Sequence, residues 1–348
     1  MISSPQGVVC WEMQIKYYLN NAGIPTSIND TSMQIIITGG AGFLGQRLAR
    51  ALLSGDMKFD KLMLVDIVEP QKPKDDKRLE CRQLDLSEAG AARTIINPQT
   101  RTIFHLAAVV SSHAEKEFDA GWKVNLDITR NLLEACRHAR QGIRFVFSSS
   151  LAVFGGELPA IVNDNTAVTP MSSYGTQKAM GELLVNDYSR KGFLDGISLR
   201  LPTVCVRPGR PNLAASSFVS SIIREPLRGE EAVCPVSIKL PLFLSSPATV
   251  ISNLIYAASI ETSNLKWKTV NLPGITTTVD EMLAALRRVT DEETVARIKF
   301  VPDDSISQIV STWPGAIDNS RALELGFRAD EKFDNFIHQY IADNKQLV

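Results

Sequence analysis

The sequence has few cysteines, almost no net charge and no long apolar run, and each absence excludes a class of protein. Its five cysteines are an odd number with no closely spaced pair, so we expect free thiols in a reducing cytoplasm rather than a disulfide framework. A net charge of -1 over 348 residues gives no electrostatic basis for binding nucleic acid or an anionic membrane. No apolar run approaches the roughly 18 residues that span a bilayer, so we expect no membrane contact.

Histidine is scarce as well. The four histidines form no pair spaced i, i+4 and no cluster with cysteine, so the sequence indicates no metal site. The remaining composition, 44 % hydrophobic and 22 % charged, is typical of a globular protein with one large domain or two moderate ones. Residues Met1–Ser32 lack a basic segment followed by an apolar one. We therefore expect an N-terminal extension outside the core fold rather than a secretory signal.

A strand, a glycine-rich turn and a helix follow one another after this segment. Ile35–Ile37 is a β-branched run, suited to a strand buried on both faces. The turn carries glycines in the pattern G-x-x-G-x-x-G, at Gly39, Gly42 and Gly45. Such a turn lets the backbone approach a pyrophosphate, which then lies on the helix N-terminus. The sequence therefore predicts a dinucleotide site that includes Phe43 and Leu44 between the glycines.

The second strand predicts which dinucleotide binds. Lys61–Val65 ends in Asp66, about twenty residues beyond the glycine turn, where such folds carry an acid. A carboxylate at this position accepts hydrogen bonds from the ribose hydroxyls and repels a 2′-phosphate. The expected cofactor is therefore NAD rather than NADP.

The third and fourth strands are expected to complete the adenine and phosphate sites. The third closes at Gln83–Leu86, where Asp85 can bond the adenine amine, Leu86 can cover the ring, and Ser87 is predicted to cap the next helix. The fourth, Ile103–Ala108, ends in small residues that let the dinucleotide approach, and its His105 is expected to be a core residue. Val109–Ser112 then leads into a loop and a long helix that contains Asn125 and Cys136.

A short strand and a helix bring three chemically useful side chains together. Phe145–Phe147 runs into three serines that end at Ser150. Tyr174 and Lys178 lie four residues apart, and so share one face at the start of a helix. A free phenol titrates near ~10, so only about 0.1 % of it is phenolate at pH 7. A nearby ammonium and an oxidised nicotinamide favour the phenolate, which makes Tyr174 a usable base, while Ser150 can hold the substrate oxygen.

The alternation of strands and helices predicts an α/β fold. It indicates a Rossmann-type, doubly wound parallel sheet with ligands at the carboxyl ends of the strands. We expect residues 33–201 to form the NAD-binding domain with the Ser, Tyr and Lys set. Residues 202–348 should form a smaller, mainly substrate-binding region, with segments such as the helix Val250–Ile260 returning to the core.

With these motifs in order, the chain resembles the extended short-chain dehydrogenase/reductase family over Met33–Asp343. The resemblance implies that Tyr174 accepts the proton, that Ser150 orients the reacting hydroxyl, and that Lys178 holds the nicotinamide ribose. It also implies a homodimer, formed by the helices around Val124–Cys136 and Met180–Tyr188. The residues expected to bind NAD are Gly39, Gly42, Phe43, Leu44, Gly45, Asp66, Asp85, Leu86, Leu106, Ala107, Ala108, Asn125, Tyr174, Lys178 and Pro202.

Within this family, three segments are similar to the D-erythronate dehydrogenases, which oxidise C2 of a four-carbon sugar acid with NAD. These segments are Ser173–Lys178, Asp187–Phe193 and Arg200–Asn212. Nucleotide-sugar members usually carry an Arg…His-Val-x-Asp run where this chain reads Leu242–Ala248, which has neither the histidine nor the acid. The leading hypothesis is therefore a dehydrogenase that converts a small 2-hydroxy sugar acid to its 2-oxo acid. The residues expected to bind this substrate are Ser111, Ser112, Ser150, Tyr174, Arg207 and Arg210.

Three alternatives stay open at this point. The first is a nucleotide-sugar epimerase or dehydratase that keeps its NAD bound. The second is a threonine-type dehydrogenase of 3-hydroxy amino acids, because Ala107–Ser111 also resembles enzymes of that kind. The third is a non-catalytic NAD-sensing protein, which would have no need of a complete Ser, Tyr and Lys set. The motifs leave open the length and stereochemistry of the acid and whether NAD leaves after each turnover.

Overall fold

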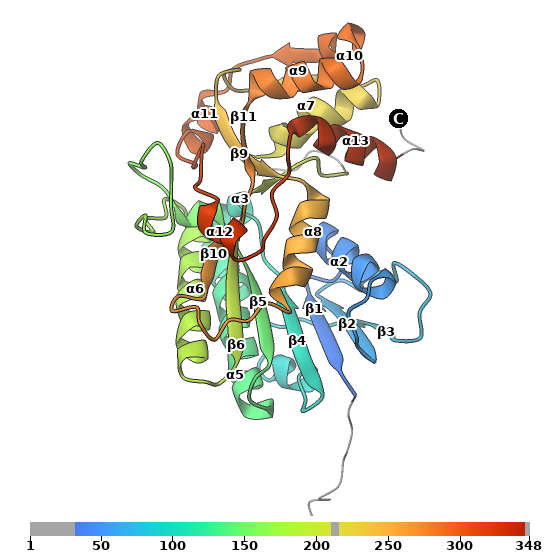
Figure 1. The fold of residues 1–348 in the computed structure, drawn as a ribbon, viewed down its shortest axis with the longest axis vertical. Coiled ribbons are helices and arrows are strands. Elements are labelled where there is room, and N and C mark those ends of the chain that lie inside the picture. Colours follow the sequence, from blue (N-terminus) through green and yellow to red (C-terminus); the bar gives the residue numbers. More distant parts are fainter. Residues whose placement is uncertain (1–31, 210–215, 345–348) are drawn as a thin grey trace, which may run out of the picture. The chain divides into compact units, whose positions relative to one another are not determined.

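A seven-stranded parallel sheet fills the lower half of the structure in Figure 1, a computed structural model that describes residues 32–209 and 216–344. The strand order is β10-β6-β5-β4-β1-β2-β3. The strands are β1 (Gln34–Thr38), β2 (Lys61–Asp66), β3 (Leu79–Gln83), β4 (Thr100–His105), β5 (Arg144–Ser150), β6 (Asp195–Leu201) and β10 (Thr269–Asn271). Chain order runs outward in opposite directions from β1 and β4, so the topological switch point lies between these strands. The predicted doubly wound α/β fold is confirmed.

Helices cover both faces of this sheet. One face carries α2 (Phe43–Ser54), α8 (Pro247–Ala257) and α12 (Ser320–Glu324). The other carries the short 3-10 turn η1 (Ala91–Thr94), α5 (Ile128–Ala139) and α6 (Ser173–Arg190). Side chains alternate along a strand, so Ile35 and Ile37 pack against the first layer while Ile36 packs against the second. The β-branched run is therefore buried on both faces, as its sequence predicts.

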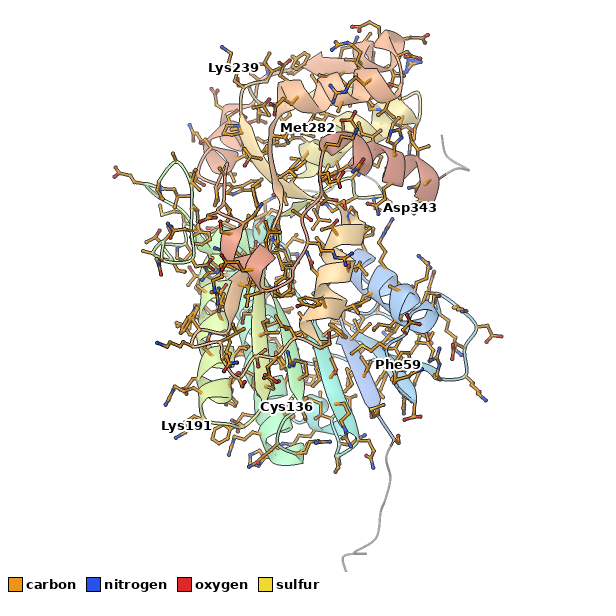
Figure 2. All side chains as sticks on the ribbon, viewed as in Figure 1. Phe59, Cys136, Lys191, Lys239, Met282 and Asp343 are labelled. Atoms are coloured by element: carbon orange, nitrogen blue, oxygen red, sulfur yellow. The ribbon has the colours of Figure 1, made fainter. Side chains whose placement is uncertain are left out.

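A second core is built mostly from residues beyond β6. Its smaller sheets are β7 (Thr203–Val204) with β9 (Pro241–Ser245) and β11 (Ile275–Thr278), and β8 (Ala232–Cys234) with β12 (Ile298–Phe300). Its helices are α7 (Ser217–Leu227), α9 (Val279–Val289), α10 (Glu292–Ala296), α11 (Asp304–Val310) and α13 (Phe333–Asp343). In Figure 2, Cys136 marks the core of the large sheet and Met282 marks this second one. The predicted helix Val250–Ile260 corresponds to α8, which returns to the large sheet together with β10.

Several predicted boundaries are wrong. The third and fourth strands end at Gln83 and His105, earlier than expected. The predicted loop after Ser112 contains α3 (Ser111–Lys116) and α4 (Phe118–Gly121) instead, and the predicted long helix consists of the π-helical turn η2 (Trp122–Asp127) followed directly by α5. Ser87 caps no helix, because its hydroxyl donates to Asp85 Oδ1 at 2.5 Å, and the next helical turn begins only after Gly90. The predicted N-terminal extension lies outside the described residues, apart from Ser32.

Candidate active site

The glycine turn between β1 and α2 leaves no room for a side chain at Gly39 or at Gly45. A Cβ on Gly39 would lie 2.8 Å from the backbone nitrogen of Ala107, and one on Gly45 would lie 2.2 Å from the carbonyl oxygen of Gly39. Gly39 also has a positive φ of 74°, which glycine adopts without strain. At the helix N-terminus, no side chain caps α2 and its first turn, which contains Phe43 and Leu44, holds no acid. The backbone N–H groups of this turn and the helix dipole therefore suit a diphosphate.

Asp66 lies directly against this turn. Its Oδ2 accepts a hydrogen bond from the backbone N–H of Ala41 at 3.0 Å, and its Oδ1 accepts one from Ile67 at 2.7 Å. The carboxylate at the end of β2 is thereby fixed beside the glycine turn, where a ribose would lie in this fold. The residues present fit an NAD molecule in this position.

The two residues that are predicted to bind adenine differ in how accessible their side chains are. Asp85 follows β3, and hydrogen bonds from Ser87 hold the pKa of its carboxyl below the usual range. Leu86 is only 4 % exposed and packs in the core with Met63 and Ile96. Its side chain therefore belongs to the hydrophobic core under the sheet.

The segment after β4 is held by bonds to β1. Leu106 N–H donates to the carbonyl oxygen of Thr38 at 3.1 Å, and Ala107 N–H donates to the Thr38 hydroxyl at 3.3 Å. His105 is 1 % exposed, and its ring nitrogens bond the hydroxyls of Thr38 at 2.7 Å and Thr129 at 2.9 Å. Burial, with the charge of Lys178, lowers the pKa of His105 to about 3. His105 is thus a neutral core histidine, as expected.

Asn125 ties this segment to the helix that carries Tyr174. Its Oδ1 accepts from Val109 N–H at 2.9 Å, and its Nδ2 donates to Val109 O at 3.2 Å and to Gln177 Oε1 at 2.8 Å. Asn125 lies in the π-helical turn η2, a feature that is frequent at functional sites. It is buried among protein groups and shapes the loop that contains Ala108. Pro202, another predicted NAD residue, is buried between β6 and β7.

Ser150, Tyr174 and Lys178 come together at the carboxyl end of β5. The helix α6 starts at Ser173, so Tyr174 lies in its first turn as predicted, and Ser172 caps it by accepting from Gly175 N–H at 3.1 Å. A Cβ on Gly175 would lie 2.0 Å from the carbonyl oxygen of Ala152, so this helix packs closely against the turn that follows Ser150.

Side-chain contacts complete the set. The Ser150 hydroxyl acts on the phenol of Tyr174, where hydrogen bonding favours the phenolate and so lowers the pKa. The Lys178 ammonium lies 5.6 Å from the centre of the Tyr174 ring and donates to the carbonyl oxygen of Ser148 at 2.7 Å. The structure therefore brings together the three residues that the sequence predicts.

The charges around Tyr174 differ from the expectation in one respect. Burial raises the pKa of Tyr174 to about 12, although the hydrogen bond with Ser150 and the charge of Arg207 both act in the opposite direction. Burial also lowers the pKa of Lys178 to about 7, against the effect of Glu182. The balance between burial and the charge of Glu182 therefore decides how far Lys178 is protonated near neutral pH. Arg207 supplies a second cation, which the Tyr and Lys motif alone does not reveal.

Arg207 is held in place by α7. Its guanidinium donates to the Ser216 hydroxyl at 3.2 Å, its N–H donates to the Ser220 hydroxyl at 3.0 Å, and its carbonyl accepts from Arg224 at 2.7 Å. Burial lowers the pKa of Arg207, and Tyr174 is among the groups that interact with its charge. Arg207 is thus a partly buried cation beside the candidate base.

The other predicted substrate residues are less constrained. Ser111 and Ser112 form the first turn of α3 and are partly buried. Glu115 on the same helix accepts a hydrogen bond from the N–H of Ser173 at 2.9 Å, which holds α3 beside the start of α6. Both serines are therefore carried by the helix next to Tyr174. Arg210 lies outside the described residues.

Two buried charges near the site were missed by the sequence interpretation. Glu182 on α6 accepts from the Ser149 hydroxyl at 2.5 Å, and both of its oxygens accept from Arg200 on β6, at 2.8 and 2.9 Å. Glu182 stands one helical turn beyond Lys178 on the same face, which was the available signal. Arg200 lay in an apolar strand and gave no comparable signal.

The described residues include no group of histidine, cysteine and acidic side chains arranged to hold a metal ion. Nor does any helix in the described ranges have the length and apolar character needed to cross a membrane.

Comparison with known proteins places the chain in a family. Residues 35–241 match the NAD dependent epimerase/dehydratase family. The chain belongs to this family. The expected family and the expected NAD cofactor are thus confirmed.

The chain is also similar to individual members over most of its length. It is 55 % identical to a D-erythronate dehydrogenase of Haemophilus influenzae, with 89 % of this chain and 99 % of that one covered. It is 48 % identical to a D-erythronate dehydrogenase of Cupriavidus necator, with 89 % and 98 % covered. Among solved structures, a nucleoside-diphosphate-sugar epimerase from Agrobacterium tumefaciens matches with a TM-score of 0.86 and 42 % identity, covering 91 % of this chain and 96 % of that one.

Proposed function

We propose that this protein is an NAD-dependent dehydrogenase that oxidises the C2 hydroxyl of a small sugar acid, D-erythronate or a close analogue, to the 2-oxo acid. The observation that carries the proposal is the assembly of Ser150, Tyr174 and Lys178 at the carboxyl end of β5, with the charge of Arg207 acting on Tyr174. In a 2-hydroxy acid the carboxylate and the reacting hydroxyl are on adjacent carbons. Groups that bind them must therefore lie close together, and the charge of Arg207 acts on the candidate base Tyr174. The likeness to two D-erythronate dehydrogenases over nearly the whole chain supports the same substrate.

The residues that would hold NAD follow from the site. The glycine turn and the start of α2 would bind the diphosphate, and Asp66 would accept bonds from the adenosine ribose. Lys178 and Tyr174 would bind the nicotinamide ribose. When bound, NAD supplies the acceptor for the hydride that leaves C2.

The chain's own residues would prepare the hydroxyl for this loss. Ser150 orients it, and Tyr174 removes its proton as a general base. The guanidinium of Arg207 can bond a planar carboxylate with two parallel hydrogen bonds, which fixes the acid end of the substrate and so the position of C2. Ser111 and Ser112 are candidates for the remaining hydroxyls.

The alternatives make different demands on the site. A 3-hydroxy amino acid would place its reacting hydroxyl one carbon farther from the carboxylate. A nucleotide sugar would instead require a large site for its own diphosphate. The likeness to a solved nucleoside-diphosphate-sugar epimerase keeps a nucleotide-sugar substrate as the second candidate.

A steady-state assay of NADH formation distinguishes these hypotheses. The purified protein is offered NAD with C4 to C6 aldonates, nucleotide sugars and threonine. The proposal expects the highest kcat/KM with D-erythronate or another short 2-hydroxy sugar acid. Turnover of threonine alone, or interconversion of a nucleotide sugar without net NADH, would replace it with the corresponding alternative.

Three further expectations belong to the same proposal. Residues 33–201 would act mainly in NAD binding and 202–348 mainly in substrate binding, with segments returning to the core. The enzyme would work in the cytoplasm. It would also form a homodimer through α5 and α6, since Leu183 on α6 is 58 % exposed. A monomer mass from light scattering at micromolar concentration would contradict the dimer.

A further inference from the structure

Polar side chains continue down the inner face of α6 beyond the catalytic set. Tyr174, Lys178, Glu182 and Asn186 recur every four residues, so they lie on one face of the helix. Lys178 and Glu182 are each 2 % exposed and Asn186 is 7 % exposed. The chemistry proposed above uses Tyr174 and Lys178 but gives no role to the buried acid that follows them.

The contacts of Glu182 fix it as a buried carboxylate. Oε1 accepts from the Ser149 hydroxyl at 2.5 Å and from Arg200 Nε at 2.9 Å, while Oε2 accepts from a terminal nitrogen of Arg200 at 2.8 Å. Arg200 is itself fixed, because it donates to Asn271 at 3.3 Å and lies over the ring of Phe154 at 4.8 Å. A two-pronged bond from a guanidinium favours the ionised carboxylate. The acid therefore sits one turn from Lys178 as a held negative charge.

We propose that Glu182 is a positioning residue whose buried charge keeps Lys178 in its ammonium form, so that Tyr174 can carry the negative charge as phenolate. This inference rests on the proposed function for its catalytic meaning, but the charge state of Lys178 can be measured without it.

Electrostatics, and not pH, decides between the two forms of the Tyr174 and Lys178 pair. Ammonium with phenolate and amine with phenol contain the same number of protons, so their ratio does not change with pH. Glu182 is one helical turn from Lys178 and two turns from Tyr174. Its charge therefore favours the ammonium more than it disfavours the phenolate.

Three other groups lie around the catalytic set, and each of them is neutral or positively charged. His105 on β4 is neutral, since its pKa is lowered to about 3. Arg200 on β6 is bound to Glu182 and offsets part of its charge. Arg207 acts on Tyr174. Glu182 raises the pKa of Lys178 while burial lowers it to about 7.

The direct test is a pH titration of Lys178 in the protein without substrate. NMR of lysine labelled with carbon-13 at Cε reports its protonation state at each pH. The signal is assigned by its loss in Lys178→Arg. Glu182→Gln keeps the shape of the side chain and removes its charge, so the Lys178 pKa should fall by roughly one unit or more. Arg200→Gln removes the opposing cation and should move the same pKa upward.

These opposite directions separate a charge effect from damage to the fold. Asp187→Asn is the matched control, because it removes an exposed acid from the same helix and should leave the titration unchanged. Ser149→Ala removes one hydrogen bond to Glu182 but no charge, and should shift the Lys178 pKa less than Glu182→Gln does. If Glu182→Gln does not fold, the Lys178 pKa in Arg200→Gln, compared with that in the controls, still tests the charge effect. An unchanged Lys178 pKa in the charge variants that fold, or a shift in the same direction in both, overturns the proposal.

Activity gives the second readout. In Glu182→Gln the high-pH plateau of kcat/KM should fall by roughly ten-fold, because one pKa unit of preference for ammonium with phenolate over amine with phenol is lost. The apparent pKa of the limb that rises with pH should fall as well. Glu182→Asp keeps the charge and should recover much of the plateau. A lower plateau with an unchanged apparent pKa of the rising limb would indicate that Glu182 has a purely structural role. A protein without dehydrogenase activity whose Lys178 pKa still responds would contradict the proposed function and leave the charge effect standing.

Discussion

Arg207, in the segment after β7, interacts through its charge with the phenol of Tyr174 on α6. This interaction links the large parallel sheet with the second core, because Tyr174 sits at the end of β5 while α7 holds Arg207. One cation can thereby serve two purposes. It lowers the cost of ionising the candidate base, and it marks where an acidic substrate group would bind.

Arg207→Gln should therefore impair binding and shift the pH profile. Loss of the two-pronged bond to a carboxylate should raise KM for the sugar acid by roughly ten-fold or more. Loss of a cation also raises the pKa of Tyr174 further, so the limb of kcat/KM that rises with pH should move to higher pH. Both effects are read from steady-state kinetics across pH. A variant with unchanged KM and an unchanged limb would place the carboxylate elsewhere.

Asp66→Asn tests the choice of cofactor. We expect the wild-type protein to prefer NAD over NADP by at least roughly ten-fold in kcat/KM, because the carboxylate repels a 2′-phosphate. The asparagine oxygen can still accept the bond from Ala41 that anchors the glycine turn, while the negative charge is lost. The preference should therefore narrow without loss of folding. Equal use of both cofactors by the wild type would contradict this role for Asp66.

Deletion of residues 1–32 should leave folding and turnover intact. The first strand begins at Gln34, and Met33 is already bound to the fold, because its N–H donates to Asp60 Oδ2 at 2.7 Å. The truncation must therefore keep Met33. The measurement is a thermal melt together with kcat/KM, and an insoluble or inactive product would show that the segment is structural.

The sequence predicted the parts of the site that depend on local pattern. The strand, glycine turn and helix at Ile35–Ser54 could be read from periodicity and spacing, as could the pairing of Tyr174 with Lys178. Ser87 was misread because a serine near a strand end can cap a helix or bond its own neighbours, and here the local bond to Asp85 prevails.

What the sequence could not supply were contacts between distant segments. Hydrogen bonds join Glu182 with Arg200 and Asn125 with Gln177 across different elements of the fold, and the charge of Arg207 acts on Tyr174 from another element. Asp330 is a further example. It accepts bonds from Ser245 and Ser246 beside the start of α8, in the segment where the nucleotide-sugar run was missing. Only the folded chain brings such partners together.

The most direct test of the account is the rate of NADH formation from D-erythronate by the wild-type protein and by Tyr174→Phe. The variant keeps the ring, so NAD binding should persist, but it lacks the group that removes the C2 hydroxyl proton. Tyr188→Phe is the control, because it alters a tyrosine on the same helix whose hydroxyl bonds Glu134, away from Ser150. We predict wild-type turnover, little change in Tyr188→Phe, and a loss of kcat by about two to four orders of magnitude in Tyr174→Phe. Near wild-type turnover in Tyr174→Phe would contradict the account.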